Sequence, residues 1–308
     1  MRILKRFLSI LLVLISTLSL SSCKLVEWWI DKRSSRSYII RFHANGGEGQ
    51  MDDLVVENGE GYLPACAFTR EGYECMAWST DEQGKKLYTR LSNLTFWLPS
   101  GLKKNDIVDL YAVWTTPGFK FNVQGFNLQY AIISSYTGTA KDVVVPAFTN
   151  GHYESPSVVG SGPVKRIGSG IFAGHTEIET VSNLPVYDIP AKLFYECTSL
   201  KSISLWPGVG EKIEEVGAQA FYNCSSLESI EFVKNSNVSI GEEAFYGCTS
   251  IKKLVIPQHV EKIEANAFYG WTEEQTIEFT WHTENIFGDE WLNGCSANIV
   301  WREEVVSE

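Results

Sequence analysis

The stretch Glu243-Ala-Phe-Tyr-Gly-Cys-Thr-Ser-Ile-Lys-Lys-Leu-Val-Ile-Pro257 decides the fold, because its Phe-Tyr-x-Cys core recurs along the chain. Near copies stand at residues 194–197 and 221–224. Aligned on the aromatic residue, the unit repeats every 22 to 27 residues, at Phe172, Phe194, Phe221, Phe245, Phe268 and Trp291. A unit this short cannot bury a core of its own and has to stack on its neighbours, so the period predicts a solenoid.

Two apolar positions keep the same register as the aromatic. Five residues before it stand Ile167, Ile189, Val216, Ile240, Ile263 and Ile286, and nine residues after it stand Val181, Ile203, Ile230, Leu254 and Ile277. Segments such as residues 200–205 and 227–232 are therefore predicted to be short strands with one apolar face. Stacked in parallel, these strands would form a continuous ribbon along one side of the solenoid.

The outward side of this ribbon is the candidate binding surface, and we call it the ribbon face. It comprises the positions eight and ten residues after each aromatic: Thr180, Ser182, Ser202, Ser204, Ser229, Glu231, Lys253, Val255, Thr276 and Glu278. These side chains are small, polar and mildly acidic. Such a regular face suits recognition of a protein or glycan through many weak contacts, and a merely solvated face is the equal alternative.

The repeat pattern is Ile-Gly-x-x-Ala-Phe-x-x-Cys-x-x-Leu-x-x-Ile, and it recurs from Ile167 onward. It resembles the leucine-rich repeats of BspA-like surface proteins, also called the Treponema pallidum type. The resemblance implies a parallel-stranded solenoid with short helical or 3-10 turns over residues 136–308. It also implies adhesion, because members of that family include adhesins for host matrix proteins and for other bacteria.

A different module precedes the solenoid, at residues 38–114, and makes the whole chain β-rich. It contains the strand-like run from Tyr38, the turn signal Asn45-Gly46-Gly47, and the aromatic core candidates Phe42, Phe68, Tyr73, Trp78 and Trp114. These blocks resemble the Listeria–Bacteroides repeat of internalin-type proteins, which implies a small β-grasp-like fold. Cys66 and Cys75 depart from that pattern, and whether they are bridged stays open. Residues 115–135 would form a linker and the start of the solenoid cap.

The first 22 residues have the features of a secretory signal peptide: Arg2, Lys5 and Arg6 precede an uncharged apolar run. The following Leu20-Ser-Ser-Cys23 resembles the bacterial lipobox, which implies lipidation at Cys23 and a lipid-anchored tether over residues 23–37. The expected location is the bacterial cell envelope, where the N-terminal lipid would attach the protein to a membrane. Surface exposure is an open alternative to an inward-facing anchor.

The charge of the chain argues against nucleic acid as a partner. The formal net charge is −11, and removal of residues 1–22 deletes three basic and no acidic residues, which leaves about −14. Such a surface repels phosphate backbones.

The repeated cysteines Cys197, Cys224 and Cys248 raise the question of thiol chemistry. Each belongs to its own rung, no Cys-x-x-Cys pair exists, and His175 and Trp271 occupy the same repeat position, so zinc is not expected. The sequence favours buried free thiols, and disulfides between neighbouring repeats remain the alternative. The glycine-rich segment 167–174 aligns with other corners and is predicted to be a turn.

No catalytic motif is found, and no cofactor or metal is predicted. The sequence therefore predicts a non-catalytic surface lipoprotein that binds a host matrix or bacterial surface protein or glycan. The alternatives are a structural or assembly component of the envelope and, less favoured, a hydrolase that uses carboxylates in an interdomain cleft.

Overall fold

The computed structural model describes residues 37–57, 62–84, 87–88, 102–124, 130–147, 164–185, 188–205, 213, 215–230, 232, 237–257, 259–280 and 290–302. The signal peptide, Cys23, Glu231 and Ile286 lie outside these residues, as does the tether up to residue 36. Within them the regular elements are strands, and none of the described residues forms a helix that could cross a membrane.

The N-terminal module is a five-stranded sheet in the order β2-β1-β5-β3-β4. Its strands are β1 (Tyr38–His43), β2 (Leu54–Val56), β3 (Glu74–Ser79), β4 (Leu87–Tyr88) and β5 (Ile107–Thr115). The central strands β1 and β5 are parallel, and the other neighbours are antiparallel. A β-grasp-like fold for this module remains a prediction.

The aromatic residues predicted for the module do form its core. Phe42, Phe68, Trp78 and Trp114 are buried, and Tyr73 packs half-buried at the edge of the cluster. The predicted turn at Asn45-Gly46 is present, with φ values of 48° and 86° and a 3.0 Å hydrogen bond from Gly47 N–H to the Ala44 carbonyl. A Cβ on Gly47 would lie 2.3 Å from the Trp114 ring, so only glycine fits there.

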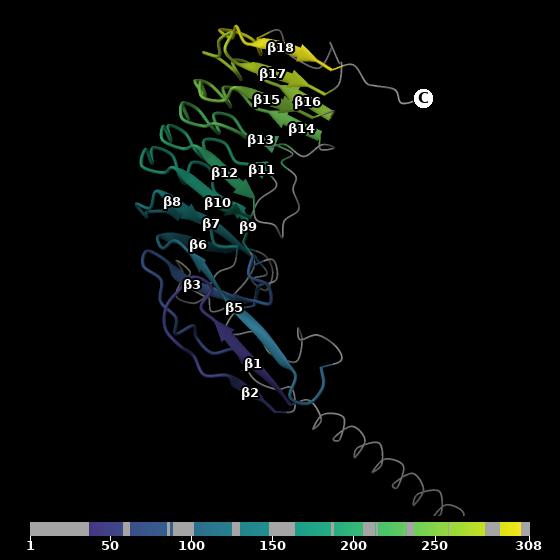
Figure 1. Cartoon of the computed structure of the whole chain (residues 1–308). Coiled ribbons are helices and arrows are strands. Elements are labelled where there is room, and N and C mark those ends of the chain that lie inside the picture. Colours follow the sequence, from purple (N-terminus) through teal and green to yellow (C-terminus); the bar gives the residue numbers. More distant parts are fainter. Residues whose placement is uncertain are drawn as a thin grey trace, which may run out of the picture.

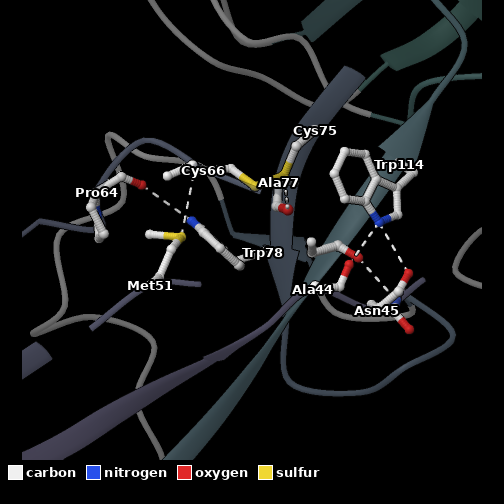
Figure 2. Close-up of a disulfide and its surroundings, with 11 residues drawn as sticks. Ala44, Asn45, Met51, Pro64, Cys66, Cys75, Ala77, Trp78 and Trp114 are labelled. Atoms are coloured by element: carbon white, nitrogen blue, oxygen red, sulfur yellow. Dashed lines mark hydrogen bonds between the residues drawn. A yellow bond between two sulfur atoms is a disulfide. The ribbon is translucent and has the colours of Figure 1, made fainter. Parts of the chain in front are cut away.

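Cys66 and Cys75 are joined by a disulfide with a Cα–Cα distance of 6.2 Å, which answers the question that the sequence left open (Figure 2). The two tryptophans beside it are held by their indole N–H groups. Trp78 Nε1 donates to the Pro64 carbonyl at 3.2 Å, and Trp114 Nε1 donates to Ala44 and Asn45 carbonyls. The base of loop 66–75 is therefore held by a covalent bond and by packing.

The solenoid starts with an antiparallel hairpin of β6 (Phe119–Gln124) and β7 (Tyr130–Tyr136), in and just beyond the predicted cap. Parallel rungs then stack in two columns (Figure 1). One column contains β8 (Asp142–Val144), β10 (Thr180–Leu184), β12 (Ser202–Leu205), β15 (Lys253–Ile256), β17 (Thr276–Phe279) and β18 (Asn298–Trp301). The other contains β9 (Val164–Ile167), β11 (Asp188–Ile189), β13 (Glu215–Val216), β14 (Asn237–Ile240) and β16 (His259–Ile263).

The predicted ribbon is formed in two pieces rather than continuously. Strands β8, β10 and β12 make one sheet, and β15, β17 and β18 make another. Between them, residues 227–230 are not a strand, so that part of the prediction is wrong. The rung keeps its place, because Glu228 N–H donates to the Lys201 carbonyl at 3.0 Å. The interruption follows the longest repeat interval, the 27 residues from Phe194 to Phe221.

Each corner of the solenoid, from two residues before the repeat aromatic to three after it, is a hydrogen-bonded turn. Its first position is left-handed at Gly170, Lys192, Gln219, Glu243 and Asn266, and its fifth at Gly174, Glu196, Asn223, Gly247 and Gly270. A helix needs consecutive right-handed residues. The helical or 3-10 turns expected at the corners are therefore not found among the described residues.

Backbone hydrogen bonds join each corner to the next one. Lys192, Phe194 and Glu196 donate their N–H groups to the carbonyls of Ala218, Ala220 and Tyr222, at 3.0, 2.8 and 2.7 Å. Gln219, Phe221 and Asn223 donate to Glu242, Ala244 and Tyr246 in the same way. Stacking thus satisfies backbone donors that a single repeat would leave unpaired.

Aromatic columns fill the corners. Phe172, Phe194, Phe221, Phe245 and Phe268 are fully buried and stack with ring centroids 5.3 to 5.8 Å apart. A second column, Tyr195, Tyr222, Tyr246 and Tyr269, stacks at 4.5 to 4.8 Å nearer the surface. The predicted strand-face residues join the same core, with Ile203 only half-buried and the others buried.

The module and the solenoid meet at a direct contact. Only Thr116 to Gly118 separate β5 from β6, and Thr116 N–H donates to the Val144 carbonyl at 3.1 Å. Met76 of β3 packs against the solenoid core. This junction brings the turn at Asn45 and the loop 66–75 close to β8 and β10.

Candidate functional site

The repeated cysteines are free, buried thiols, as predicted. Their S–H groups also have a specific partner: Cys197, Cys224 and Cys248 donate to the carbonyls of Phe172, Phe194 and Phe221 on the preceding rung, at 2.9, 3.0 and 3.0 Å. Trp271, which stands at the cysteine position of the next repeat, donates its indole N–H to Phe245 at 3.0 Å. The position therefore requires a buried donor rather than a thiol.

The electrostatic environment makes these thiols unreactive. Burial raises the pKa of Cys197 to about 12 and raises the pKa of Cys224 and Cys248 further. The deprotonated thiolate is the form of cysteine that acts as a nucleophile or binds a metal, and the raised pKa values disfavour this form. Among the described residues no three His, Cys, Asp or Glu side chains are grouped closely enough to hold a metal ion.

His175 occupies the same position in the first repeat. Its Nδ1 lies 2.7 Å from Glu177 Oε1, and this hydrogen bond is the first cause of the lowered pKa of Glu177. The ring also packs against Tyr136, with centroids 5.3 Å apart. His175 thus closes the N-terminal end of the cysteine column.

The ribbon face has the predicted orientation at most of its residues. Ser202, Ser204, Ser229, Lys253 and Val255 are exposed, and Thr180, Ser182 and Thr276 are half-buried. Register aligns them in rows, since Thr180 pairs with Ser202 and Lys253 pairs with Thr276. The structure thus places eight of these ten residues on one side: seven lie in two strand groups, and Ser229 lies in the non-strand segment 227–230 between them.

Glu278 is the exception on the ribbon face. It was expected to face solvent, yet its side chain is only 7% exposed, because Lys253 Nζ and Arg302 Nε each lie 2.7 Å from its carboxylate. The hydrogen bond from Lys253 is the first cause of the lowered pKa of Glu278. The C-terminal part of the face therefore presents the two cations rather than the carboxylate.

A column of alternating charge runs beside the ribbon face, and the sequence interpretation missed it. Seven residues after the aromatic, or six in the repeat of Phe268, the first five repeats carry Glu179, Lys201, Glu228, Lys252 and Glu274, with Lys141 before them. Glu179 bridges Lys141 and Lys201 at 3.1 and 2.6 Å, and Lys252 pairs with Glu274 at 3.2 Å. The repeat register could have found this column, because the spacing alone defines it.

The same repeats are recognised by comparison with known proteins. Residues 165–299 match the family model of the BspA type leucine rich repeat region, in six copies. This region is therefore similar to BspA-type leucine-rich repeats, which supports the resemblance predicted for the solenoid. The BspA-type repeats begin at β9 and extend to β18, whereas the assignment of the preceding module to the Listeria–Bacteroides repeat stays a prediction.

Solved structures of other repeat proteins are similar over about half of the chain. The T. pallidum leucine rich repeat protein has 27% identity and a TM-score of 0.44, with 53% of this chain and 71% of that chain covered. A leucine rich cell surface protein of Faecalibacterium prausnitzii has 25% identity and a TM-score of 0.41, covering 54% and 44%. A leucine-rich repeat protein of Bacteroides ovatus has 23% identity and a TM-score of 0.43, covering 52% and 39%. No curated protein matches the chain.

Proposed function

We propose that the protein is a non-catalytic, lipid-anchored binding protein of the bacterial cell envelope. Its role is adhesion to a host matrix or bacterial surface protein or glycan, and the ribbon face is its contact surface. The observation that carries the proposal is the set of outward residues held in register on parallel strands. Strands about 4.8 Å apart hold side chains at a fixed spacing, which suits a repetitive or extended partner.

The composition of the face supports binding by many modest contacts. Short hydroxyl side chains such as Ser202, Ser204 and Ser229 lose little rotamer entropy when a partner covers them. Lys253 and Val255 add a cation and an apolar contact near the C-terminal end. The BspA-type repeats are consistent with such a role, because solenoids commonly bind through a regular extended surface.

A binding screen tests the role of the ribbon face. The fragment from Ser37 onward contains all the described residues and is screened against matrix proteins, bacterial surface proteins and glycans. The variants Ser229→Arg and Lys253→Glu should each weaken the binding of a ligand found in this way. Glu215→Arg, at an exposed residue of β13 in the other column of strands, is the matched control. Binding that survives both ribbon substitutions would move the site elsewhere.

Anchoring at Cys23 is a separate part of the proposal, supported by the lipobox resemblance of residues 20–23. Acyl chains contribute about 0.8 kcal/mol per buried methylene, so several chains together hold a protein at a membrane. Labelled fatty acid should enter the wild-type protein and not Cys23→Ser. Unchanged labelling and membrane retention of the variant would contradict the anchor.

The second candidate is a structural or assembly component of the envelope, favoured by the direct contact between module and solenoid at Thr116 and Val144. Protease added to intact cells separates the two roles. An adhesin should be cleaved, whereas protection until the cells are opened would favour the structural role.

A further inference from the structure

We infer that the junction between the module and the solenoid holds a binding site for a sugar residue that carries a carboxylate. A cavity of about 300 Å³ opens there. The module contributes Asn45, Arg70, Tyr73 and Trp114 to its lining, and the solenoid contributes Ser182 and Asn183. The site rests on the proposed binding function, since Ser182 belongs to the ribbon face.

The guanidinium of Arg70 is the central group of the site. It stacks over the Tyr73 ring with Cζ 4.2 Å from the ring centroid, and a Cβ on Gly46 would lie 3.7 Å from its Nη1. Arg70 forms no ion pair with any residue that the structure describes, whereas Arg41 and Arg302 are both paired with carboxylates. A planar guanidinium with free N–H groups fits a carboxylate through two parallel hydrogen bonds.

The segment that carries Arg70 is built to be rigid. Tyr73 N–H donates to the Arg70 carbonyl at 3.0 Å, and Thr69 exchanges two backbone hydrogen bonds with Glu48. The disulfide between Cys66 and Cys75 closes the base of the same loop (Figure 2). A loop whose backbone is held in place before binding loses little conformational entropy on binding, which favours recognition of a small ligand.

The solenoid wall shows an irregularity at the same place. The register of β10 against β12 shifts between Val181 and Leu184, and Asn183 has a φ of 62°. A shift of this kind re-aims a side chain out of the regular face, and such irregularities gather near functional sites. The Ser182 hydroxyl donates to the Val143 carbonyl at 3.3 Å and can still accept a hydrogen bond, so with the amide of Asn183 it supplies groups that match sugar hydroxyls.

The charge around the cavity defines the ligand more narrowly. The chain carries a net charge of −11, and Glu82 also lines the cavity, so a densely charged polyanion would be repelled. One carboxylate, opposite Arg70, on a ring with hydroxyl groups satisfies both the cation and the surrounding polar groups. Glu82 would accept hydrogen bonds from ligand hydroxyls.

Calorimetric titration of the mature chain in detergent micelles tests the site. The probes are glucuronate- and galacturonate-containing tetrasaccharides, their carboxyl-reduced neutral forms, and an acidic peptide of the same charge. We expect an acidic tetrasaccharide to bind at least tenfold more tightly than its neutral form and than the peptide. Arg70→Ala should weaken that binding at least tenfold, Arg70→Lys should weaken it less, and Arg41→Ala should leave it unchanged.

Several results would overturn the inference: no binding of any acidic sugar, equal binding of the reduced forms, preference for the peptide, or an undiminished affinity of Arg70→Ala. Because Arg70 is exposed, its replacement should leave the fold intact, and unchanged near-ultraviolet circular dichroism checks this. The ribbon variants Ser229→Arg and Lys253→Glu should retain sugar binding. A wild-type protein that binds a ligand through the ribbon face but binds no acidic sugar would refute this inference and leave the proposed function standing.

Discussion

At the scale of single residues, the repeated cysteine acts as a buried hydrogen-bond donor and not as a reactive thiol. Within each corner, the carbonyl of the repeat phenylalanine accepts the N–H group three residues later, and the thiol of the next rung supplies a second donor. Leaving a buried acceptor short of a partner costs free energy. Cysteine and tryptophan both meet the requirement, which explains why Trp271 can replace a thiol.

Replacement of Cys248 by Ala should lower the free energy of unfolding by about 1–3 kcal/mol, because it removes both a buried side chain and the donor to Phe221. Cys295→Ala is the control, since Cys295 is only partly buried, and it should cost less. Urea unfolding measures both. Equal losses in the two variants would show that the donor at position 248 contributes nothing.

The ion pairs of Glu278 predict a dependence on acid pH. Its pKa is lowered in the folded state, so its contribution is present above the unfolded value, about 4.3, and is lost as the pH falls through the lower folded value. At pH 7, Glu278→Gln should be less stable than wild type by about 1–2 kcal/mol, and the difference should shrink towards pH 3.

The control for this prediction is Glu274→Gln. Its side chain is 79% exposed in its pair with Lys252, so the change should cost less than about 0.5 kcal/mol. A difference between wild type and Glu278→Gln that does not change from pH 7 to pH 3 would contradict the assignment.

At the scale of elements, the corners depend on left-handed residues at two fixed positions. Some of these are glycine and others carry side chains, so the repeat tolerates strain at several rungs. The requirement comes from the ladder of hydrogen bonds between corners, which needs the backbone N–H groups to face the next rung. Backbone conformation, not side-chain packing, therefore limits substitution here.

Gly270→Ala isolates this effect, because a Cβ there meets no atom closer than 3.9 Å while φ is +84°. The variant should lose about 1–2 kcal/mol of stability from backbone strain alone. Lys192→Gly makes the opposite change at a left-handed residue with φ of 59° and should be roughly neutral. Thermal or urea unfolding compares the two, and a neutral Gly270→Ala would refute the strain argument.

Much of the fold at this scale could be predicted from the sequence. The register of the phenylalanines and of the buried positions five and nine residues away identified the rungs. The sequence could not predict the break at residues 227–230, because Leu227 and Ile230 keep the apolar spacing of the other rungs and are buried like them. It also could not exclude helical corners, since Lys192, Gln219 and Glu243 do not signal left-handed backbone as glycine does.

The candidate site was predictable only in part. Spacing placed Ser202, Ser229 and Lys253 outward, but the burial of Glu278 depends on Arg302, which lies in another rung. The junction cavity could not be found from sequence, because it joins Arg70 to Asn183, residues of two modules. The disulfide could not be assigned from the sequence either, because its assignment requires the distance between Cys66 and Cys75.

At the scale of the whole molecule, the buried thiols predict that the free energy of unfolding falls at alkaline pH. Their folded pKa values are raised, so they affect stability little below the unfolded value of about 8.5. Above it the unfolded chain loses protons first, and stability falls as the pH rises, by at most about 1.4 kcal/mol per pH unit for each thiol.

Urea midpoints from pH 7 to pH 10 should therefore fall more steeply for wild type than for a variant with Cys197, Cys224 and Cys248 all replaced by Ala. Lysine and tyrosine titration is common to both proteins and cancels in the comparison. Equal slopes would show that the thiols titrate alike in the folded and unfolded states.

The hydrogen bonds between corners have one consequence for how such molecules can join. At every described corner step the backbone donates towards the higher-numbered rung, as from Phe194 to Ala220 and from Phe221 to Ala244. A stack of this kind has a direction, like a filament with unlike ends. Two copies could extend one another's ladder only with the end of one on the start of the other, because a symmetric pair joined through matching ends would set donor against donor or acceptor against acceptor.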